Sequence, residues 1–96
     1  MKDLQEVEEF FQEKYRNNPE FKEAWDEIEL QYELAREIIR RRNELGLTQK
    51  ELAERIGSSQ SEISRIENGH NCNLDTINKI AKSLKSKPKI HFEAIS

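Results

Sequence analysis

Residues 48–69 read TQKELAERIGSSQSEISRIENG, and this stretch decides the fold. Thr48 and Ser59 are each followed three residues later by a glutamate, which is the capping-box pattern of a helix start. Gly57 and Gly69 stand where two such helices would end, because glycine tolerates the left-handed backbone of a helix terminus. The stretch therefore predicts two short helices joined by a tight turn, the arrangement of a helix-turn-helix.

The two predicted helices are amphipathic, and the outward side chains of the second have the chemistry that reads DNA. Glutamine and arginine form bidentate hydrogen bonds with adenine and guanine edges, and serine bonds to either. Caps and apolar spacing alone fit an ordinary pair of antiparallel helices equally well, so the outward chemistry is what favours DNA binding. The expected inward residues are Leu52, Ala53, Ile56, Ile63 and Ile66, and the outward ones on the second helix are Gln60, Ser61, Ser64 and Arg65.

Residues 34–84 resemble the Cro/repressor (XRE-type) helix-turn-helix family. The resemblance rests on Thr-Gln-x-Glu-Leu-Ala followed by Gly-x-Ser-Gln-x-x-Ile-Ser-Arg-x-Glu-Asn-Gly. It implies that Gln49 contacts phosphate and also touches the start of the second, DNA-reading helix. It further implies a salt bridge between Arg42 and Glu67 that orients this helix, while Arg42 can also touch phosphate. The alternative for this pair is two solvated charges, which contribute about 0–1 kcal/mol.

The candidate DNA contacts fall into three groups. Gln60 and Ser61 open the second helix and are the best candidates for base-edge contacts. Arg65 lies one turn further on and either forks onto a guanine, which we favour, or lies along phosphate without reading sequence. Contacts that position the backbone or offer amides to phosphate are expected from Ser59, Ser64, Asn68 and Asn71.

The charge of the chain divides into an acidic front and a basic rear. Residues 1–35 hold eleven Asp/Glu and four Lys/Arg, a net charge of −7. Residues 36–96 hold eight Asp/Glu and twelve Lys/Arg, a net charge of +4. Attraction to phosphate depends on local charge, so the rear can bind DNA although the whole chain carries −3. Such asymmetry suggests different partners for the two parts, unless the front is simply a solvated helix face.

Bulk properties limit the class of protein. Hydrophobic residues make up 34% and charged residues 36% of the 96, which fits one small, highly charged domain. We expect a cytoplasmic protein without membrane association, because no apolar run reaches bilayer length and Cys72 has no partner for an intrachain disulfide. His70 and Cys72 lack a second ligand pair at zinc-site spacing, and no catalytic motif is identifiable. We therefore expect neither an enzyme nor a cofactor.

The whole chain is expected to be mainly α-helical, a repressor-like helix-turn-helix bundle with a helical extension in front and one β-strand behind. Asn18 and Pro19 begin a long helix that runs to about residue 45, with a bend near Glu29 left open. Asn73 can cap a further helix that ends before Pro88. The expected divisions are an acidic amphipathic extension at 1–29, a DNA-binding domain at 30–86 and a C-terminal strand at 87–96.

The last residues alternate apolar and polar side chains. Ile90, Phe92 and Ala94 share one face, which is a strand pattern. No other segment of the chain alternates in this way, so the backbone groups of a strand here must pair with water or with another chain. We expect a homodimer formed by antiparallel pairing of two such strands, with a disordered tail as the alternative.

The combination of a Pro-Glu-Phe-led helix, the repressor-type motif and a terminal strand is similar to HigA-type antitoxins. This resemblance implies a repressor that binds double-stranded operator DNA as a dimer and neutralises a HigB/RelE-like ribonuclease toxin. Such a toxin needs a basic surface, which the acidic front complements. The alternative is a stand-alone phage- or element-type repressor without a toxin. Candidate aromatic anchors for the toxin are Phe10, Phe11, Phe21 and Trp25. The equal alternative is that these rings pack on one another or on the domain.

Overall fold

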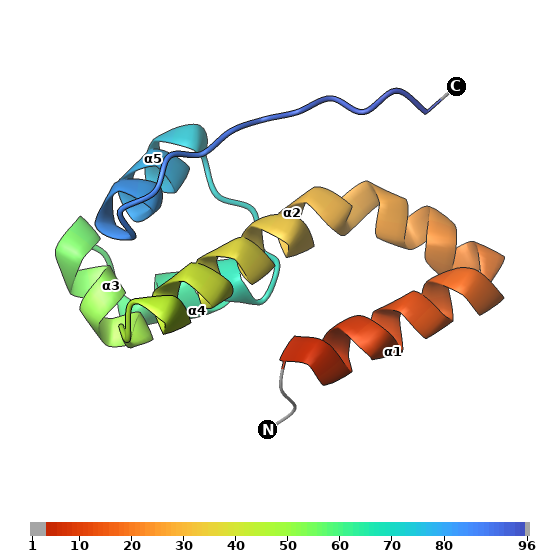
Figure 1. The fold of residues 1–96 in the computed structure, drawn as a ribbon, viewed down its shortest axis with the longest axis horizontal. Coiled ribbons are helices and arrows are strands. Elements are labelled where there is room, and N and C mark those ends of the chain that lie inside the picture. The colour runs from red at the N-terminus through yellow and green to blue at the C-terminus, as the bar shows by residue number, and fades with distance from the viewer. Residues whose placement is uncertain (1–3, 96) are drawn as a thin grey trace.

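The computed structural model describes residues 4–95, with every side chain in that range except those of Leu4 and Phe11. The predicted toxin contact at Phe11 therefore lies outside the described side chains. The fold is mainly helical, as predicted, and α2 is one continuous helix of 26 residues. The helices of the described residues are α1 (Leu4–Asn17), α2 (Pro19–Glu44), α3 (Gln49–Ile56), α4 (Gln60–Glu67) and α5 (Leu74–Ser83), drawn in Figure 1.

The hydrophobic core lies between α3, α4, α5 and the C-terminal half of α2. Leu52 and Ile63 are fully buried at its centre, and Ile66 and Ile80 are 1% exposed. Four of the five inward residues expected from the sequence are buried, and Ile56 is half-buried against the same cluster. The remaining buried members of this core are Ile38, Leu47, Ala53 and Leu84.

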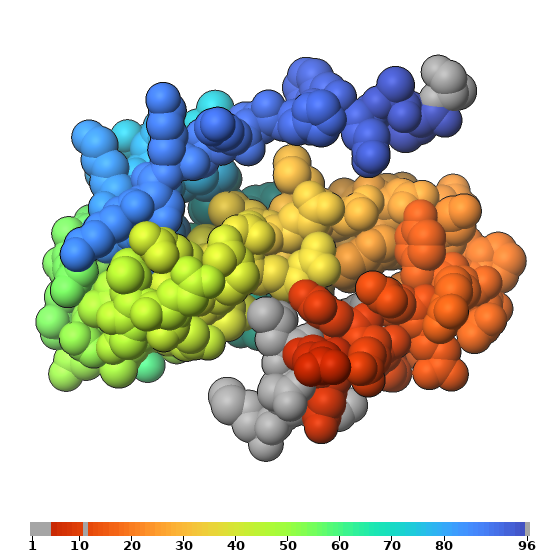
Figure 2. All heavy atoms as spheres, viewed as in Figure 1, coloured from red at the N-terminus to blue at the C-terminus, as the bar shows by residue number. Residues whose placement is uncertain are grey.

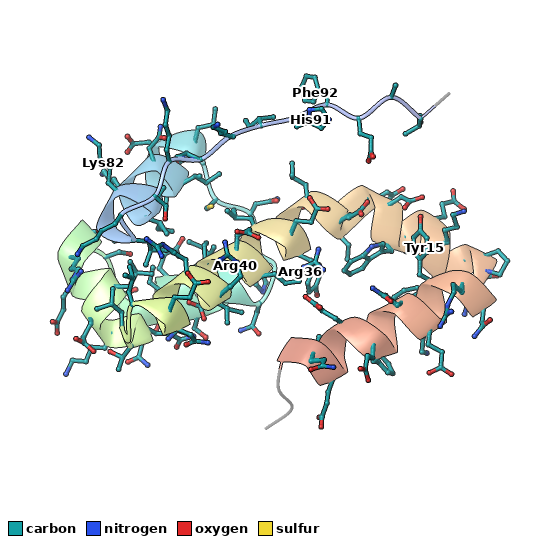
Figure 3. All side chains as sticks on the ribbon, in the orientation of Figure 1. Tyr15, Arg36, Arg40, Lys82, His91 and Phe92 are labelled. Carbon is teal, nitrogen blue, oxygen red and sulfur yellow. The ribbon has the colours of Figure 1, made fainter. Side chains whose placement is uncertain are left out.

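The front of the chain forms a helical hairpin in which α1 packs against the first half of α2. Asn18 caps α2 by accepting a hydrogen bond from the Phe21 amide at 3.1 Å. The Tyr15 hydroxyl donates to Asp26 at 3.0 Å, and this bond is the main cause of a raised Tyr15 pKa. Figure 3 shows Arg36 on α2, where it pairs with Glu8 of α1 at 3.5 Å. Polar contacts thus join α1 to α2 within the hairpin.

The predicted C-terminal strand is wrong for the single chain. Residues 86–95 have no regular secondary structure, and Figure 2 shows the segment leaving the helical body as an extended arm. Phe92 is 92% exposed and Ile90 76% exposed, so the apolar side chains of this segment are not buried against the described helices. Because a strand requires a neighbour for its backbone hydrogen bonds, alternation alone cannot create one. The division at residues 29 and 30 falls inside α2, so it marks no break in secondary structure.

Candidate nucleic-acid interface

The turn between α3 and α4 is built by local side-chain bonds. The Thr48 hydroxyl accepts from the Glu51 amide at 3.0 Å, and the Glu51 carboxylate accepts from the Thr48 amide at 3.1 Å, which completes the predicted capping box. Gly57 ends α3 with φ +68°, in the left-handed region. Ser59 begins α4 by accepting a hydrogen bond from the Glu62 amide at 3.1 Å. Between these two described residues, the Ser59 amide does not donate in return to the Glu62 carboxylate. The second predicted box is therefore a simple serine cap.

One face of α4 is buried and the other is open to solvent. Ile63 and Ile66 point into the core, whereas Gln60, Ser61 and Arg65 are exposed as the sequence predicts. An amide, a hydroxyl and a guanidinium thus project from the first two turns of a helix that is fixed from behind. This is the geometry with which a helix reads base edges in the major groove.

The far end of α4 is fixed by a buried ion pair. The Arg42 guanidinium donates to both carboxylate oxygens of Glu67, at 2.8 and 3.0 Å, and to the carbonyl of Leu47 at 2.8 Å. The Glu67 side chain is only 5% exposed and the Arg42 side chain 14%. Bidentate pairs of this kind give geometric specificity as well as energy. The ion pair implied by the family resemblance is therefore present, and it joins α2 to the end of α4.

Two predicted phosphate contacts have partners inside the protein. The Gln49 amide donates to Glu67 at 3.1 Å, so it touches the end of α4 and not its start. The Asn68 amide turns back to donate to the Ser64 carbonyl at 2.8 Å, where it helps to end α4. The Gln49 nitrogen makes this one bond and keeps a second hydrogen for phosphate, whereas the Asn68 nitrogen also donates to the Ser64 hydroxyl at 3.5 Å. Ser64 is half-buried, while Ser59 and Asn71 are exposed.

The positive charge of the rear is spread unevenly. Five of its twelve Lys/Arg residues lie on α5 and the C-terminal arm, and all five side chains are exposed. Figure 3 shows Lys82 on the outer side of α5, away from α4. On α4 itself Arg65 carries the only positive charge. The exposed face of α4 therefore presents hydrogen-bonding groups more than net charge. The five lysines are Lys79, Lys82, Lys85, Lys87 and Lys89.

The acidic hairpin carries an aromatic cluster and an open cleft. Phe21 stacks on Trp25 with ring centroids 6.2 Å apart, and Trp25 lies 5.0 Å from Tyr32. Phe10 of α1 is 46% exposed, and the Lys14 ammonium lies 5.6 Å from its ring centroid. A cleft of about 440 Å³ opens between α1 and α2, with Trp25 and Tyr32 on one wall. The structure thus brings together two of the four predicted anchors and leaves Phe10 on the outside.

Comparison with known families identifies the family of the basic rear of the chain. A helix-turn-helix family model matches residues 38–90, which is more than half of the chain. The chain belongs to this XRE-type helix-turn-helix family. No match was found among curated proteins or among solved structures.

The XRE-type helix-turn-helix family is a family of DNA-binding domains. The matched range begins within α2 and excludes α1 and the aromatic cluster. No helix within residues 4–95 has both the length and the apolar character to cross a bilayer.

Two residues that contact the segment following α4 were missed from the sequence, namely Gln31 and Tyr32 of α2, whose partners are Asn71 and Gly69. Both stand in an ordinary amphipathic pattern, and their contacts lie far along the chain. No local signal distinguishes them.

Proposed function

We propose that this XRE-type helix-turn-helix protein is a sequence-specific transcriptional repressor that reads operator DNA through the exposed face of α4. The observation that carries the proposal is the pairing of outward Gln60, Ser61 and Arg65 with the buried pair of Arg42 and Glu67. Side chains suited to base edges are thereby presented on a helix whose end is fixed. In this arrangement Arg65 supplies a guanine contact, while Ser59, Asn68 and Asn71 serve the phosphate backbone.

The repressor acts as a homodimer in this proposal. Ile90 and Phe92 are exposed on the C-terminal arm, and Ala94 shares their face of the alternation. Antiparallel pairing of two arms would satisfy their backbone groups and cover this apolar face. The two copies of α4 would then lie one DNA turn apart, roughly 34–36 Å, to occupy two half-sites.

The repressor is also the antitoxin of a HigB/RelE-like ribonuclease toxin. Support comes from the resemblance to HigA-type antitoxins and from the acidic front, which carries −7 within residues 1–35. A ribonuclease that grips RNA phosphates needs a basic surface, and the acidic hairpin complements such a surface. Phe10, Phe11, Phe21 and Trp25 are the proposed apolar anchors for this partner.

Coexpression with the product of the neighbouring reading frame tests the antitoxin role. We expect a small basic ribonuclease to copurify with the chain and to be inactive in the complex. Phe10→Ala combined with Trp25→Ala should release the ribonuclease, whereas Leu74→Ala, an exposed apolar change on α5, should retain it. Retention of the ribonuclease by the double variant would contradict the assignment of the anchors.

A stand-alone repressor is the second candidate. The observation that favours it is the stacking of Phe21, Trp25 and Tyr32 on one another, which gives these rings a structural role without any partner. This candidate predicts that no basic protein copurifies while operator binding remains. The coexpression experiment therefore separates the two candidates in one preparation.

A further inference from the structure

The segment that leaves α4 is held by two adjacent residues of α2. The Gln31 amide nitrogen donates to the Asn71 carbonyl oxygen at 2.7 Å, across 40 residues of sequence. Tyr32 lies against Gly69, where an added Cβ would come within 2.9 to 3.2 Å of three ring atoms. Gly69 has φ +89°, so the chain turns sharply under the ring. Two adjacent residues of α2 thus contact residues 69 and 71, and we call residues 69–71 the exit of α4.

These two α2 residues lie ahead of the range that the family model matches, which begins at residue 38. Their contacts therefore lie outside the matched range. Tyr32 also lies 5.0 Å from Trp25, so this part of α2 is continuous with the aromatic cluster of the hairpin. Tyr32 therefore contacts both the aromatic cluster of the hairpin and the segment that follows α4.

The hydrogen bond to Gln31 decides which end of the Asn71 amide is available. A phosphate oxygen only accepts hydrogen bonds, so an asparagine must present its nitrogen to DNA. Gln31 occupies the Asn71 oxygen, and within residues 4–95 no group accepts a hydrogen bond from the Asn71 nitrogen. The exposed nitrogen is thereby left for an acceptor outside the chain.

We infer that Gln31 and Tyr32 are positioning residues for DNA binding, which fix the exit of α4 and turn the Asn71 amide nitrogen toward a phosphate. This inference rests on the proposed function, because it requires the end of α4 to lie on DNA. It extends that function, because part of the affinity for DNA would then depend on two residues that lie ahead of the range matched by the family model. The contact reads no sequence, since phosphate contacts position the protein without specifying bases.

A double-mutant cycle on a pool of random-sequence duplexes tests the Gln31 contact in the full-length chain. Gln31→Ala and Asn71→Ala should each weaken binding, roughly two- to tenfold for the loss of one hydrogen bond. The double variant should lose no more than Asn71→Ala alone, because Gln31 acts through Asn71. The slope of affinity against salt should stay unchanged, since a neutral amide releases no counterion. Leu30→Ala, on the same turn and 76% exposed, is the control that should bind as tightly as the wild type.

Two further variants separate the ring of Tyr32 from its hydroxyl. Tyr32→Phe keeps the ring against Gly69 and should bind DNA normally, whereas Tyr32→Ala should weaken binding to all sequences alike. Thermal unfolding of each variant shows whether the chain is folded, and the Gln31 cycle decides the inference if Tyr32→Ala fails to fold.

Wild-type affinity in Gln31→Ala, or an equal further loss when Gln31→Ala is added to Asn71→Ala, would overturn the inference. If Arg65→Ala still relaxes the sequence preference in that case, only the positioning role has failed. If Arg65→Ala also leaves the sequence preference unchanged, the proposed DNA-reading surface has failed with it.

Discussion

Arg42 and Glu67 form a bidentate ion pair that ties the last turn of α2 to the end of α4, with N–O distances of 2.8 and 3.0 Å. The Glu67 carboxylate is 5% exposed and also accepts from Gln49. A carboxylate this deeply buried is tolerated only because its oxygens are occupied by donors. The pair therefore belongs to the framework of the domain as much as to its DNA surface.

Removing Arg42 should strongly destabilise the domain. Arg42→Ala leaves the Glu67 charge buried with only the Gln49 amide, and loss of one partner of a buried pair costs about 3–5 kcal/mol. Glu67→Gln should cost less, because Arg42 is more exposed and still donates to the Leu47 carbonyl. Urea denaturation followed by circular dichroism measures both variants. A loss below about 1 kcal/mol for Arg42→Ala would mean that the pair behaves as a solvated one.

Gly69→Ala should cost more stability than Gly57→Ala. Both glycines have positive φ, +89° and +68°, so either alanine carries a backbone penalty of about 1–2 kcal/mol. Only at Gly69 does the new Cβ also meet a ring, that of Tyr32 at 2.9 Å, while nothing lies within 4 Å at Gly57. The difference in unfolding free energy between the two variants isolates the contact with Tyr32. Equal losses would show that the ring moves aside freely.

The thiol of Cys72 should react more slowly than an ordinary cysteine near neutral pH. Burial against the core raises its pKa, and the nearby Glu62 carboxylate raises it further. Because only the thiolate is alkylated, the pH midpoint of iodoacetamide labelling in the folded chain should lie above that in urea. The folded chain also holds the thiol proton more tightly than the unfolded chain does. The free energy of unfolding should therefore fall as the pH rises through the pKa of the thiol. Identical midpoints in the folded and unfolded chain would contradict the burial.

The C-terminal arm should control oligomeric state through one face only. Phe92→Lys places a charge on the apolar face, whereas His91→Lys places a charge on the opposite face of the alternation. We expect light scattering to find a monomer for Phe92→Lys and for a chain that ends at Lys87, and a dimer for His91→Lys. A truncated chain that remains dimeric would exclude the arm as the interface.

Local features of the fold were predictable because the bonds that make them join neighbours in sequence. Asn18, Thr48, Ser59 and Asn73 all cap helices as their positions predict, each by accepting from an amide three residues on. Such bonds depend on little besides residue type and spacing. The same reasoning wrongly predicted a full capping box at Ser59, because the Glu62 side chain does not accept a hydrogen bond from the Ser59 amide.

Long-range features needed more than spacing. The link between Arg42 and Glu67, 25 residues apart, was expected only through the family resemblance. The contact of Gln31 with Asn71 depends on how α2 crosses the exit of α4, which no pattern within either segment specifies. The C-terminal alternation was misread for a related reason. Its pattern is the same whether or not a neighbouring strand is present.

Selection from a random duplex library tests most directly whether the outward face of α4 reads sequence. We expect the wild type to enrich one motif. Gln60→Ala and Arg65→Ala should each relax the preference at the base pairs they contact, with about 1–3 kcal/mol of discrimination lost for a good bidentate contact. Lys82→Ala, which removes a positive charge from α5, should enrich the wild-type motif. If Gln60→Ala and Arg65→Ala also enrich that unchanged motif, or if the wild type enriches none, α4 does not read DNA.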